Sequence, residues 1–530
     1  MKQHFILLTA LLFACAGSKA QNLYSFGGTT TDAITSIAID KQENVLCALS
    51  ATSDTTHIGD TIYHKRGAYL VKIRPDSTIA WHVYLGNGLY NTSFSIPVVH
   101  VNAANEYFVT GLYTDTFSIG NITLTDTGDN AFIARLDTNG APVYLKRLGN
   151  RVIMRDFCFD AQGNIIIAGL ARGNAATLLG DSIHTYGNTM DILLAKLTPQ
   201  ADVLWHTTAG GGGTYSEYLT SVCVDAADNI YVGGSIRSNA AFDNLTIQVH
   251  TTATYTGIVA KYNSSGAAQW VNRSGQFVET VACTPGGEVL AGGDGRGIFG
   301  TDTLWDVDGF LSGFNTTGGL TFVHGILESD SLTPNGSVAS IKRLSNGNFL
   351  VAGFAADTFY FGNMLYTEGV LSQTGFTGTF DITGQATQKS QIVLSNALLL
   401  HSIDISECTF AAGGMVGYQQ PNPQQDTVVT WGSGDGFMLV NKISNDCETI
   451  TGIPSPVQSG FLLYPNPADN AVNMHVSEIV NTVSCHDMAG RTCDVSYSLS
   501  NSLLSINTQQ LSPGMYILKI NGLTAKFVKQ

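Results

Sequence analysis

The side chains that most often carry catalysis are present in this sequence of 530 residues, but their spacing defines no catalytic motif. Twelve histidines are scattered along the chain, and none belongs to a His-Glu-x-x-His or similar metal-binding pattern. The sequence has neither a Gly-x-Ser-x-Gly nucleophile motif nor a phosphate-binding P-loop. The glycine run at residues 210–213 precedes no expected helix, so we interpret it as a loop. The sequence therefore predicts no catalytic residue, no metal site and no cofactor.

Acidic residues recur at one position of a repeated pattern, which holds Asp191, Asp308 and Asp435, with Asn130 at the matching place. A ring of carboxylates could hold cations, but Asp and Asn also cap turns through side-chain hydrogen bonds, and we favour the capping role. Residues 293–297 (Gly-Asp-Gly-Arg-Gly) look briefly like a calcium loop but lack the further acidic ligands that such a loop needs.

The repeated pattern returns about every 60 residues, and it predicts the architecture. Each copy has an apolar strand, a turn similar to Asp-x-x-Gly-Asn, and a second apolar strand that ends in small residues. A hairpin, a third strand and a fourth strand with an aromatic residue follow. The aligned position of the second strand holds Leu49, Gly111, Gly169, Gly234, Gly293, Gly353 and Gly413, at spacings of 62, 58, 65, 59, 60 and 60 residues.

Four short strands in each of seven copies predict an all-β fold, a seven-bladed β-propeller, because a single blade can bury its faces only against neighbouring blades. The fourth strands carry Trp81, Tyr144, Trp205, Trp270 and Phe322. We interpret these aromatic residues as contacts between blades rather than as ligand contacts.

The two ends of the repeated region predict how the ring closes. The seventh copy lacks a fourth strand of its own, whereas residues 22–28 look like a fourth strand without a blade. We therefore expect Leu23 to Phe26 to pair beside the strand near Phe437, which leaves no unpaired sheet edge between the ends. The repeat resembles the bacterial SBBP-type β-propeller repeat over residues 22–450. That resemblance implies an architecture and says almost nothing about a ligand.

A second pattern begins after a linker at residues 448–460, which contains two prolines. Alternating apolar and polar residues over 461–530 predict a small β-sandwich. This segment resembles the type A C-terminal sorting domain of the type IX secretion system. The matching residues are Tyr464, Pro465, Asn466 and Pro467, Gly490 in the turn at 487–491, Gly514 and Tyr516, and Lys526 and Lys529 near the C-terminus.

The resemblance implies export across the outer membrane of a Bacteroidota-type cell, with the secretion and sorting machinery as partner. It also implies removal of the tail, followed by release of the protein or attachment to the cell surface.

The first 20 residues resemble a signal peptide, with Lys2 before an apolar core at residues 5–14 that is too short to span a bilayer. Cleavage is expected between Ala20 and Gln21. An alternative is a lipidation motif that ends at Cys15. Removal of residues 1–20 leaves 24 basic against 41 acidic side chains and eight cysteines. In an exported protein Cys485 and Cys493 could bridge a hairpin, whereas Cys158 and Cys223 are expected to be small buried thiols.

The net charge of −17 after cleavage disfavours nucleic acid as a partner, because phosphate binding needs clustered Lys and Arg. No later segment is apolar for long enough to predict a transmembrane helix. The expected domains are a signal peptide (1–20), a propeller (21–447), a linker (448–460) and a sorting domain (461–530). We expect a non-catalytic module that binds a glycan or a protein. The alternative is a glycan-active lyase or hydrolase with its site at the central channel.

Overall fold

The computed structural model describes most of the chain after the first 21 residues. The described residues are 22–86, 97–128, 130–186, 189–212, 216–249, 255–300, 302–304, 307–328, 336–356, 359–361, 364–366, 373–392, 398–406, 409–417, 434–442, 470–475, 482–487, 491–500, 503–520 and 523–529. Within these ranges the secondary structure is entirely β, without a helix. The chain divides into two compact units, Met1–Gln419 with Val428–Ile453, and Gln420–Thr427 with Pro454–Gln530. The expected all-β class is confirmed.

The strands of the first unit pair in antiparallel groups of four, in the order that the repeat predicts. The groups in the first half of the chain are β2 (Asp32–Ile39), β3 (Val45–Ala51), β6 (Gly67–Ile73) and β7 (Ile79–Tyr84); β8 (Val98–Val101), β9 (Tyr107–Tyr113), β12 (Asn130–Leu136) and β13 (Pro142–Asn150); β14 (Val152–Phe159), β15 (Ile165–Arg172), β18 (Met190–Leu197) and β19 (Val203–Ala209); and β20 (Tyr218–Val224), β21 (Ile230–Ile236), β24 (Thr256–Tyr262) and the first part of β25 (Ala268–Cys283).

The later groups follow the same order, and the long strand β25 continues from one group into the next. They are the second part of β25 with β26 (Val289–Phe299), β28 (Gly309–Phe314) and β29 (Leu320–Glu328); β30 (Ser337–Arg343), β31 (Phe349–Ala356), β34 (Gln373–Phe380) and β35 (Ala386–Ile392); and β36 (Leu398–Ile405), β37 (Thr409–Gly417), β38 (Gly434–Lys442) and β1 (Asn22–Phe26).

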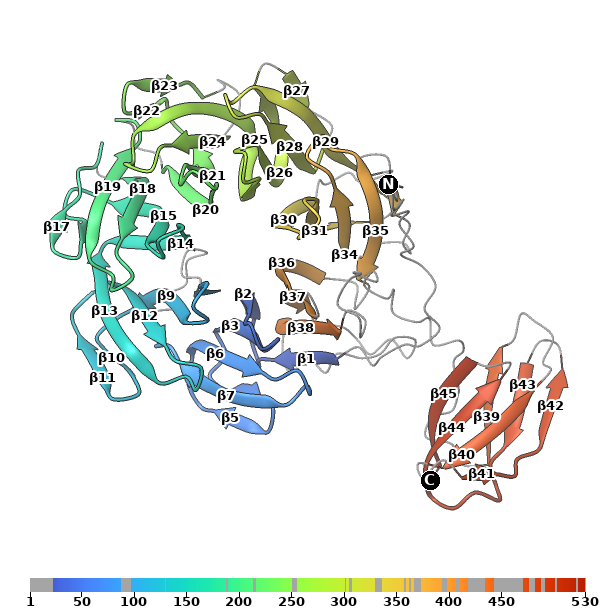
Figure 1. The fold of residues 1–530 in the computed structure, drawn as a ribbon. Helices are drawn as coiled ribbons and strands as arrows, with labels where there is room; N and C mark the ends of the chain where they lie inside the picture. Colours follow the sequence, from blue (N-terminus) through green and yellow to red (C-terminus); the bar gives the residue numbers. More distant parts are fainter. Residues whose placement is uncertain are drawn as a thin grey trace, which may run out of the picture. The chain divides into compact units, whose positions relative to one another are not determined.

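Short outer strands form the hairpins that the repeat predicts between its second and third strands. They are β4 (Thr56–Ile58) with β5 (Thr61–Tyr63), β10 (Thr116–Ile119) with β11 (Ile122–Thr125), β16 (Thr177–Leu178) with β17 (Asp181–Ser182), β22 (Ala240–Phe242) with β23 (Leu245–Ile247), β32 (Phe359–Phe361) with β33 (Met364–Tyr366), and β27 (Asp302–Leu304) with the end of β26. Figure 1 shows the groups arranged around a central space, with β2, β14, β20, β25, β30 and β36 on the inside.

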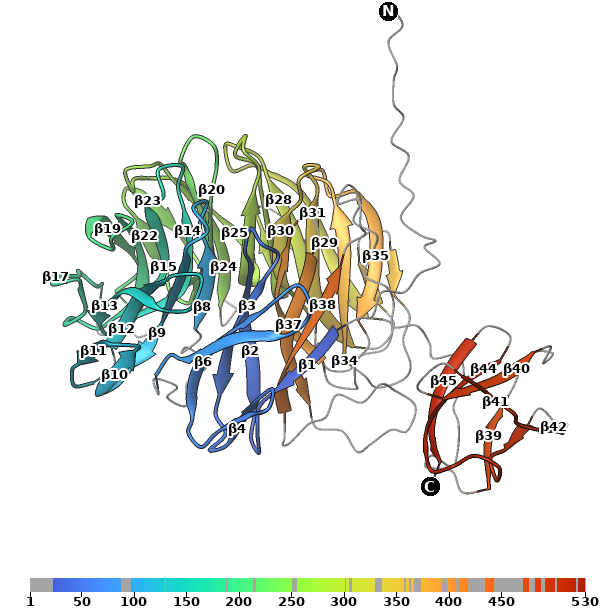
Figure 2. The same cartoon turned by 60° about the horizontal axis from the view of Figure 1, so that its bottom comes forward.

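The first strand of the described chain pairs with the last strand of the first unit. Strand β1 runs antiparallel to β38, with Ser25 opposite Phe437 and Phe26 opposite Gly436. Both views show β1 beside β38 (Figures 1 and 2). The expected pairing of residues 23–26 near Phe437 is confirmed. It gives β38 a hydrogen-bonded neighbour on the side that faces away from β37.

The recurrent glycine of the second strand has a steric cause. Most inner strands carry a register shift at the same place, for example between Met154 and Asp156 in β14 and between Leu219 and Ser221 in β20. A Cβ atom on Gly169 would lie 2.0 Å from the carbonyl oxygen of Ile153, immediately before the shift. At Gly169 the bulge brings a backbone carbonyl so close to the next strand that a side chain would clash with it.

The recurrent aromatic residue of the fourth strand packs on a turn of the following group. Trp81 donates through Nε1 to the carbonyl oxygen of Thr138 at 3.1 Å, and Trp205 donates to that of Ser264 at 3.2 Å. Trp270 donates in the same way to Thr316 at 3.2 Å. The expected role in contacts between groups is therefore confirmed for these residues, because each indole pairs its N–H with a turn about one repeat further along the chain.

The second unit contains two antiparallel sheets that share one apolar core. One sheet has the order β39 (Ala471–His475), β43 (Leu503–Asn507) and β42 (Tyr497–Ser500). The other has the order β41 (Thr492–Cys493), β40 (Val483–Asp487), β44 (Gly514–Ile520) and β45 (Leu523–Lys529). Val472 and Ile506 from the first sheet pack with Cys485, Leu518 and Ile520 from the second. The alternating residues of this segment therefore place their apolar side chains between the sheets.

Candidate central cavity

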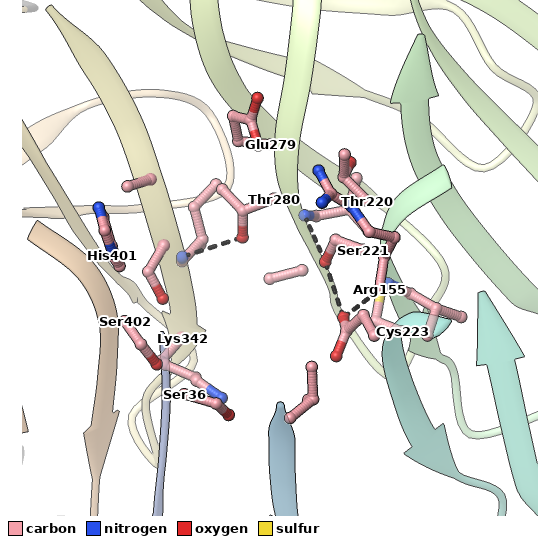
Figure 3. A pocket seen from close by; sticks show the side chains of 18 of the residues that line it. Ser36, Arg155, Thr220, Ser221, Cys223, Glu279, Thr280, Lys342, His401 and Ser402 are labelled. Carbon is pink, nitrogen blue, oxygen red and sulfur yellow. Dashed lines mark hydrogen bonds between the residues drawn. The ribbon is translucent and has the colours of Figure 1, made fainter. Parts of the chain in front are cut away.

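The inner strands of the first unit enclose a cavity of about 790 Å³. Its wall is formed by β2, β8, β14, β20, the second part of β25, β30 and β36, so every group of four strands contributes to it. This volume lies in the range of about 300–1,000 Å³ that is typical of small-molecule sites. Figure 3 shows the side chains that point into it.

A belt of small polar side chains in this wall connects neighbouring inner strands. Each accepts a hydrogen bond from a backbone N–H of the following strand. The pairs are Ser36 with Val99 (3.1 Å), Ser221 with Val281 (3.2 Å), Thr280 with Ile341 (3.2 Å), Ser340 with Ile403 (3.4 Å) and Ser402 with Ile37 (3.1 Å). Two of these contacts appear as dashed lines in Figure 3. A hydroxyl in this belt satisfies buried backbone groups and is therefore part of the framework.

Asp156 replaces a hydroxyl in the belt and is also committed to the framework. Its Oδ2 atom accepts from Val222 N at 2.9 Å and from Ser221 Oγ at 3.1 Å. Its Oδ1 atom lies 3.0 Å from Nε2 of His100, which connects β8 to β14 where Val98 has no hydroxyl to offer. With both oxygens occupied, Asp156 has no free capacity for proton transfer to a ligand.

Two other acidic residues in the wall, Glu279 and Asp294, do not have both carboxylate oxygens in such hydrogen bonds among the described residues. Burial raises the pKa of Glu279, and the nearby Arg155 guanidinium opposes that rise. Burial raises the pKa of Asp294 to about 7, and the negative charge of Glu279 adds to the effect. The Oδ1 atom of Asp294 has no hydrogen-bond partner among the described residues. Burial thus favours the neutral form of both carboxyl groups, and Asp294 can exchange a proton near neutral pH.

Arg155 completes this acidic part of the wall, which we call the acid end (Arg155, Glu279 and Asp294), and the buried Tyr218 ring lies beside it. The Arg155 guanidinium lies 5.7 Å from the centre of the Tyr218 ring. The charges of Glu279 and Asp294 add to the effect of burial in raising the pKa of Tyr218, and that of Arg155 opposes it. The acid end therefore offers a cation and two carboxyl groups to a ligand.

The remaining ionisable groups lie elsewhere on the wall. Burial lowers the pKa of His401, so its imidazole is neutral at neutral pH. Lys342 Nζ lies 3.8 Å from Asp404 Oδ1, while Oδ2 of Asp404 accepts from Ile39 N at 2.7 Å. Figure 3 places Lys342 away from Glu279 along the cavity. The cavity thus has an acid end and, apart from it, a lysine paired with a structural aspartate.

Three cysteines from neighbouring inner strands, Cys158, Cys223 and Cys283, also line the cavity. Burial and a hydrogen bond with Cys283 raise the pKa of Cys223, and burial does the same for Cys158. These thiols are half-buried at the cavity surface, whereas we expected Cys158 and Cys223 to be small buried thiols. The difference arises because the inner strand faces a cavity on one side instead of a packed core.

The residues predicted for sorting lie in the second unit, and the structure describes part of them. Gly514 in β44 lies opposite Lys529 in β45, and Ile517 lies opposite Lys526. Tyr516 is buried and donates to the carbonyl oxygen of Ser512 at 2.8 Å. Ala20, Gln21, the run at 464–467 and Gly490 lie outside the described residues.

The cysteine pair of the second unit has the register that a hairpin bridge requires. Cys485 in β40 lies directly opposite Cys493 in β41, and neither sulfur is in a disulfide here.

The acid end was not found from the sequence, although part of its signal was present. Asp294 belongs to the glycine-rich run that we considered as a calcium loop, and Glu279 is an acid within an apolar strand. Among the described residues, no group of three or more His, Cys, Asp or Glu has a metal-binding arrangement. In the same part of the chain, no helix is long and apolar enough to cross a membrane.

The comparisons with known proteins identify the tail. Residues 462–530 match the family of secretion system C-terminal sorting domains. The tail is therefore a sorting domain of the type IX secretion system, which implies export to the cell surface or the medium. A search of curated proteins found no match to the chain.

Solved structures with partial similarity include a protein of unknown function from Bacteroides caccae (11% identity, TM-score 0.33, 61% of this chain and 90% of that chain). Another protein of unknown function, from Dyadobacter fermentans, has 11% identity and a TM-score of 0.35 over 68% of this chain and 98% of that chain. The gluconolactonase XC5397 from Xanthomonas campestris has 13% identity and a TM-score of 0.29 over 62% and 86%. At these scores the similarities support no inference about function.

Proposed function

We propose that this protein is an exported, non-catalytic binding module, in which a seven-bladed β-propeller of the SBBP type presents a central cavity to a small polar ligand. The propeller spans residues 21–447, after a signal peptide at 1–20 that is cleaved between Ala20 and Gln21. A linker at 448–460 leads to the sorting domain at 461–530. The pairing of β1 with β38 and the hydrogen bond from Ile37 N to Ser402 Oγ support the ring.

The observation that carries the binding function is that some polar side chains of the cavity wall bond to the backbone whereas others do not. The hydroxyl belt and Asp156 are committed to backbone groups, so they hold the inner strands in place. The acid end lies in the same wall, where Asp294 Oδ1 has no hydrogen-bond partner among the described residues, and it combines carboxylate acceptors with a guanidinium. This set of groups suits a ligand with several hydroxyls, such as a saccharide, because hydroxyls both donate and accept.

Binding of glycans to the mature full-length chain tests this proposal. Saccharides that bind on a glycan array are then titrated into the wild type and into Glu279→Gln, which keeps the side-chain shape and removes the charge. Asp302→Asn, an exposed acid on β27, is the matched control. We expect the Glu279→Gln variant to bind at least about tenfold more weakly, the equivalent of about 1.4 kcal/mol. Equal affinities of wild type and variant would disprove a role for the acid end.

The raised pKa values of Glu279 and Asp294 favour one second candidate, a glycan-active enzyme. Two carboxyl groups in one cavity, of which Asp294 has a pKa of about 7, are the kind of pair that acid–base cleavage of a glycosidic bond uses. Incubation of the array-positive saccharides with the mature chain, followed by mass spectrometry, distinguishes the two functions. Cleavage that disappears in Asp294→Asn would identify an enzyme, whereas intact saccharides would identify a binding module.

A further inference from the structure

A second acidic site lies outside the cavity, at Asp191 and Glu217. Asp191 is near the start of β18 and Glu217 immediately precedes β20, the inner strand of the following group. The N–H of Glu217 donates to the carbonyl oxygen of Met190 at 2.7 Å, which brings the two acids together. Both side chains are completely buried, at 0% exposure.

Each of these carboxylates has one oxygen with a hydrogen-bond partner and one without. Asp191 Oδ2 accepts from Tyr186 N at 2.9 Å, and Glu217 Oε1 accepts from Ser238 Oγ. Asp191 Oδ1 and Glu217 Oε2 have no partner within the described chain, and neither acid forms an ion pair there. The hydrogen bond from Tyr186 N is the kind of cap that we expected for Asp191, and it uses only one of the two carboxylate oxygens.

An equivalent position elsewhere in the repeat shows what a satisfied acid looks like in this fold. Asp32 is the first residue of the inner strand β2, at the place that Glu217 takes immediately before β20, and it is also buried. It accepts from Gly28 N and Ser53 Oγ through Oδ2, and from Thr52 N and Ser53 N through Oδ1. The framework can thus provide four donors at this position, and it provides no partner for Oε2 of Glu217.

The surroundings of the pair consist of oxygen atoms packed around two glycines. A Cβ atom on Gly210 would lie 2.2 Å from Asp191 Oδ1. On Gly211 it would lie 2.4 Å from Ser238 Oγ and 2.1 Å from the carbonyl oxygen of Asn239. The absence of side chains at these two residues lets charged and neutral oxygens approach one another, without any sulfur or imidazole ligand.

We propose that Asp191 and Glu217, together with the oxygens of Ser238 and Asn239, bind one Ca²⁺ ion. Carboxylate and neutral oxygens are the ligands of hard cations, and a divalent ion balances the formal charge of two carboxylates. Ca²⁺ suits this buried set better than Mg²⁺, which keeps several waters and requires regular octahedral geometry. The ion would join β18 to the start of the next group, at a place distinct from the cavity.

The electrostatics of the pair agree with this role. Burial raises the pKa of Asp191 to about 6, and burial together with the charge of Asp191 raises that of Glu217 to about 7. Two buried negative charges near neutral pH are costly unless a cation accompanies them.

The test measures the melting temperature and calcium binding of the mature full-length chain after treatment with a chelator. Calcium chloride is added at neutral pH, with magnesium chloride and sodium chloride at equal ionic strength for comparison. At about a hundred times the dissociation constant we expect calcium to raise Tm by at least about 2 °C. Calorimetry should give one site per chain, with weaker or no binding of magnesium.

Two variants and one control make the outcome specific. Glu217→Gln and Asp191→Asn should fold, because each keeps its shape, and should lose the calcium-induced shift in Tm. Asp32→Asn should lower Tm in the chelator yet keep the full calcium shift, because it removes a hydrogen-bonded acid at an equivalent position without touching the site. A full shift in Glu217→Gln would place the ion elsewhere and overturn the proposal.

An absence of any calcium effect on the wild type would also overturn it. In that case the two acids would share a proton, and stability in the chelator would fall as the pH rises from their ordinary pKa values, 3.8 and 4.5, to the raised values of about 6 and about 7. Glu217→Gln would not show that fall.

Discussion

Replacement of Phe26 by alanine tests whether the first described strand, β1, stabilises the whole first unit. The Phe26 side chain is 1% exposed and packs in a core with Ile34 of β2 and Met438 of β38. Its ring also stacks on Tyr24, at 6.1 Å between ring centres. Truncation of a buried phenylalanine to alanine costs about 3–5 kcal/mol, through lost burial and the cavity left behind.

We therefore expect Phe26→Ala to lower the free energy of unfolding by about 3–5 kcal/mol. The assay is equilibrium unfolding in urea, followed by tryptophan fluorescence. All five tryptophans precede residue 448, so the signal reports on the first unit and not on the sorting domain. The slope of the transition should stay unchanged if the variant affects stability alone.

The matched control is Tyr360→Ala, an aromatic residue on β32 that is 51% exposed and should change stability by at most about 0.5 kcal/mol. A loss below about 1 kcal/mol for Phe26→Ala would refute the reasoning, because it would mean that β1 contributes little to the fold. The same loss for both variants would show that the effect belongs to aromatic residues in general and not to the closing strand.

Three further predictions follow from the geometry. Ser402→Ala removes the acceptor of Ile37 N and should cost about 1–3 kcal/mol in the same urea assay, whereas an effect near zero would show that the polar belt is not structural. The pKa of Asp294 in the folded protein is about 7, above its ordinary value of 3.8. Asp294 therefore does not lower the stability of the fold at a pH below 3.8, and it destabilises the fold increasingly as the pH rises from there towards 7. Asp294→Asn should accordingly lose less melting temperature than the wild type between acidic and neutral pH, and equal losses would contradict the assignment. Deletion of the matched tail, residues 462–530, should leave the chain in the periplasm, as measured by cell fractionation, and continued appearance in the medium or on the cell surface would contradict its sorting role.

Much of the fold was predictable because it depends on local and repeated signals. The spacing of about 60 residues, the turn residues and the aromatic residue of the fourth strand recur in successive copies, so each copy supports the interpretation of the others. Trp81 and Trp205 were expected at contacts between groups, and both donate to a turn of the following group. The pairing of residues 23–26 with β38 was predictable from one missing strand and one extra strand.

The candidate sites were less predictable because their residues come from different copies of the repeat. Glu279 and Arg155 approach each other only because inner strands from separate groups face the same cavity. Asp191 attracted attention as a recurrent aspartate, but its partner Glu217 did not, because the approach of the two depends on the junction between consecutive groups. The spacing of residues within one strand or turn predicts neither the approach of Glu279 to Arg155 nor that of Asp191 to Glu217.

The sequence by itself determined the all-β class, the order of strands within each group, the packing role of the fourth-strand aromatics and the sorting tail. These depend on side-chain alternation, turn chemistry and a contiguous tail motif, which act over short stretches of chain. The tertiary structure alone decided which polar residues are left for chemistry. Asp156 and the hydroxyls of the inner strands resemble site residues in the sequence, but hydrogen bonds between strands consume them. Glu279, Asp294, Asp191 and Glu217 keep reactive carboxyl groups because the packing of separate repeats buries them beside like charges, with too few donors to satisfy them.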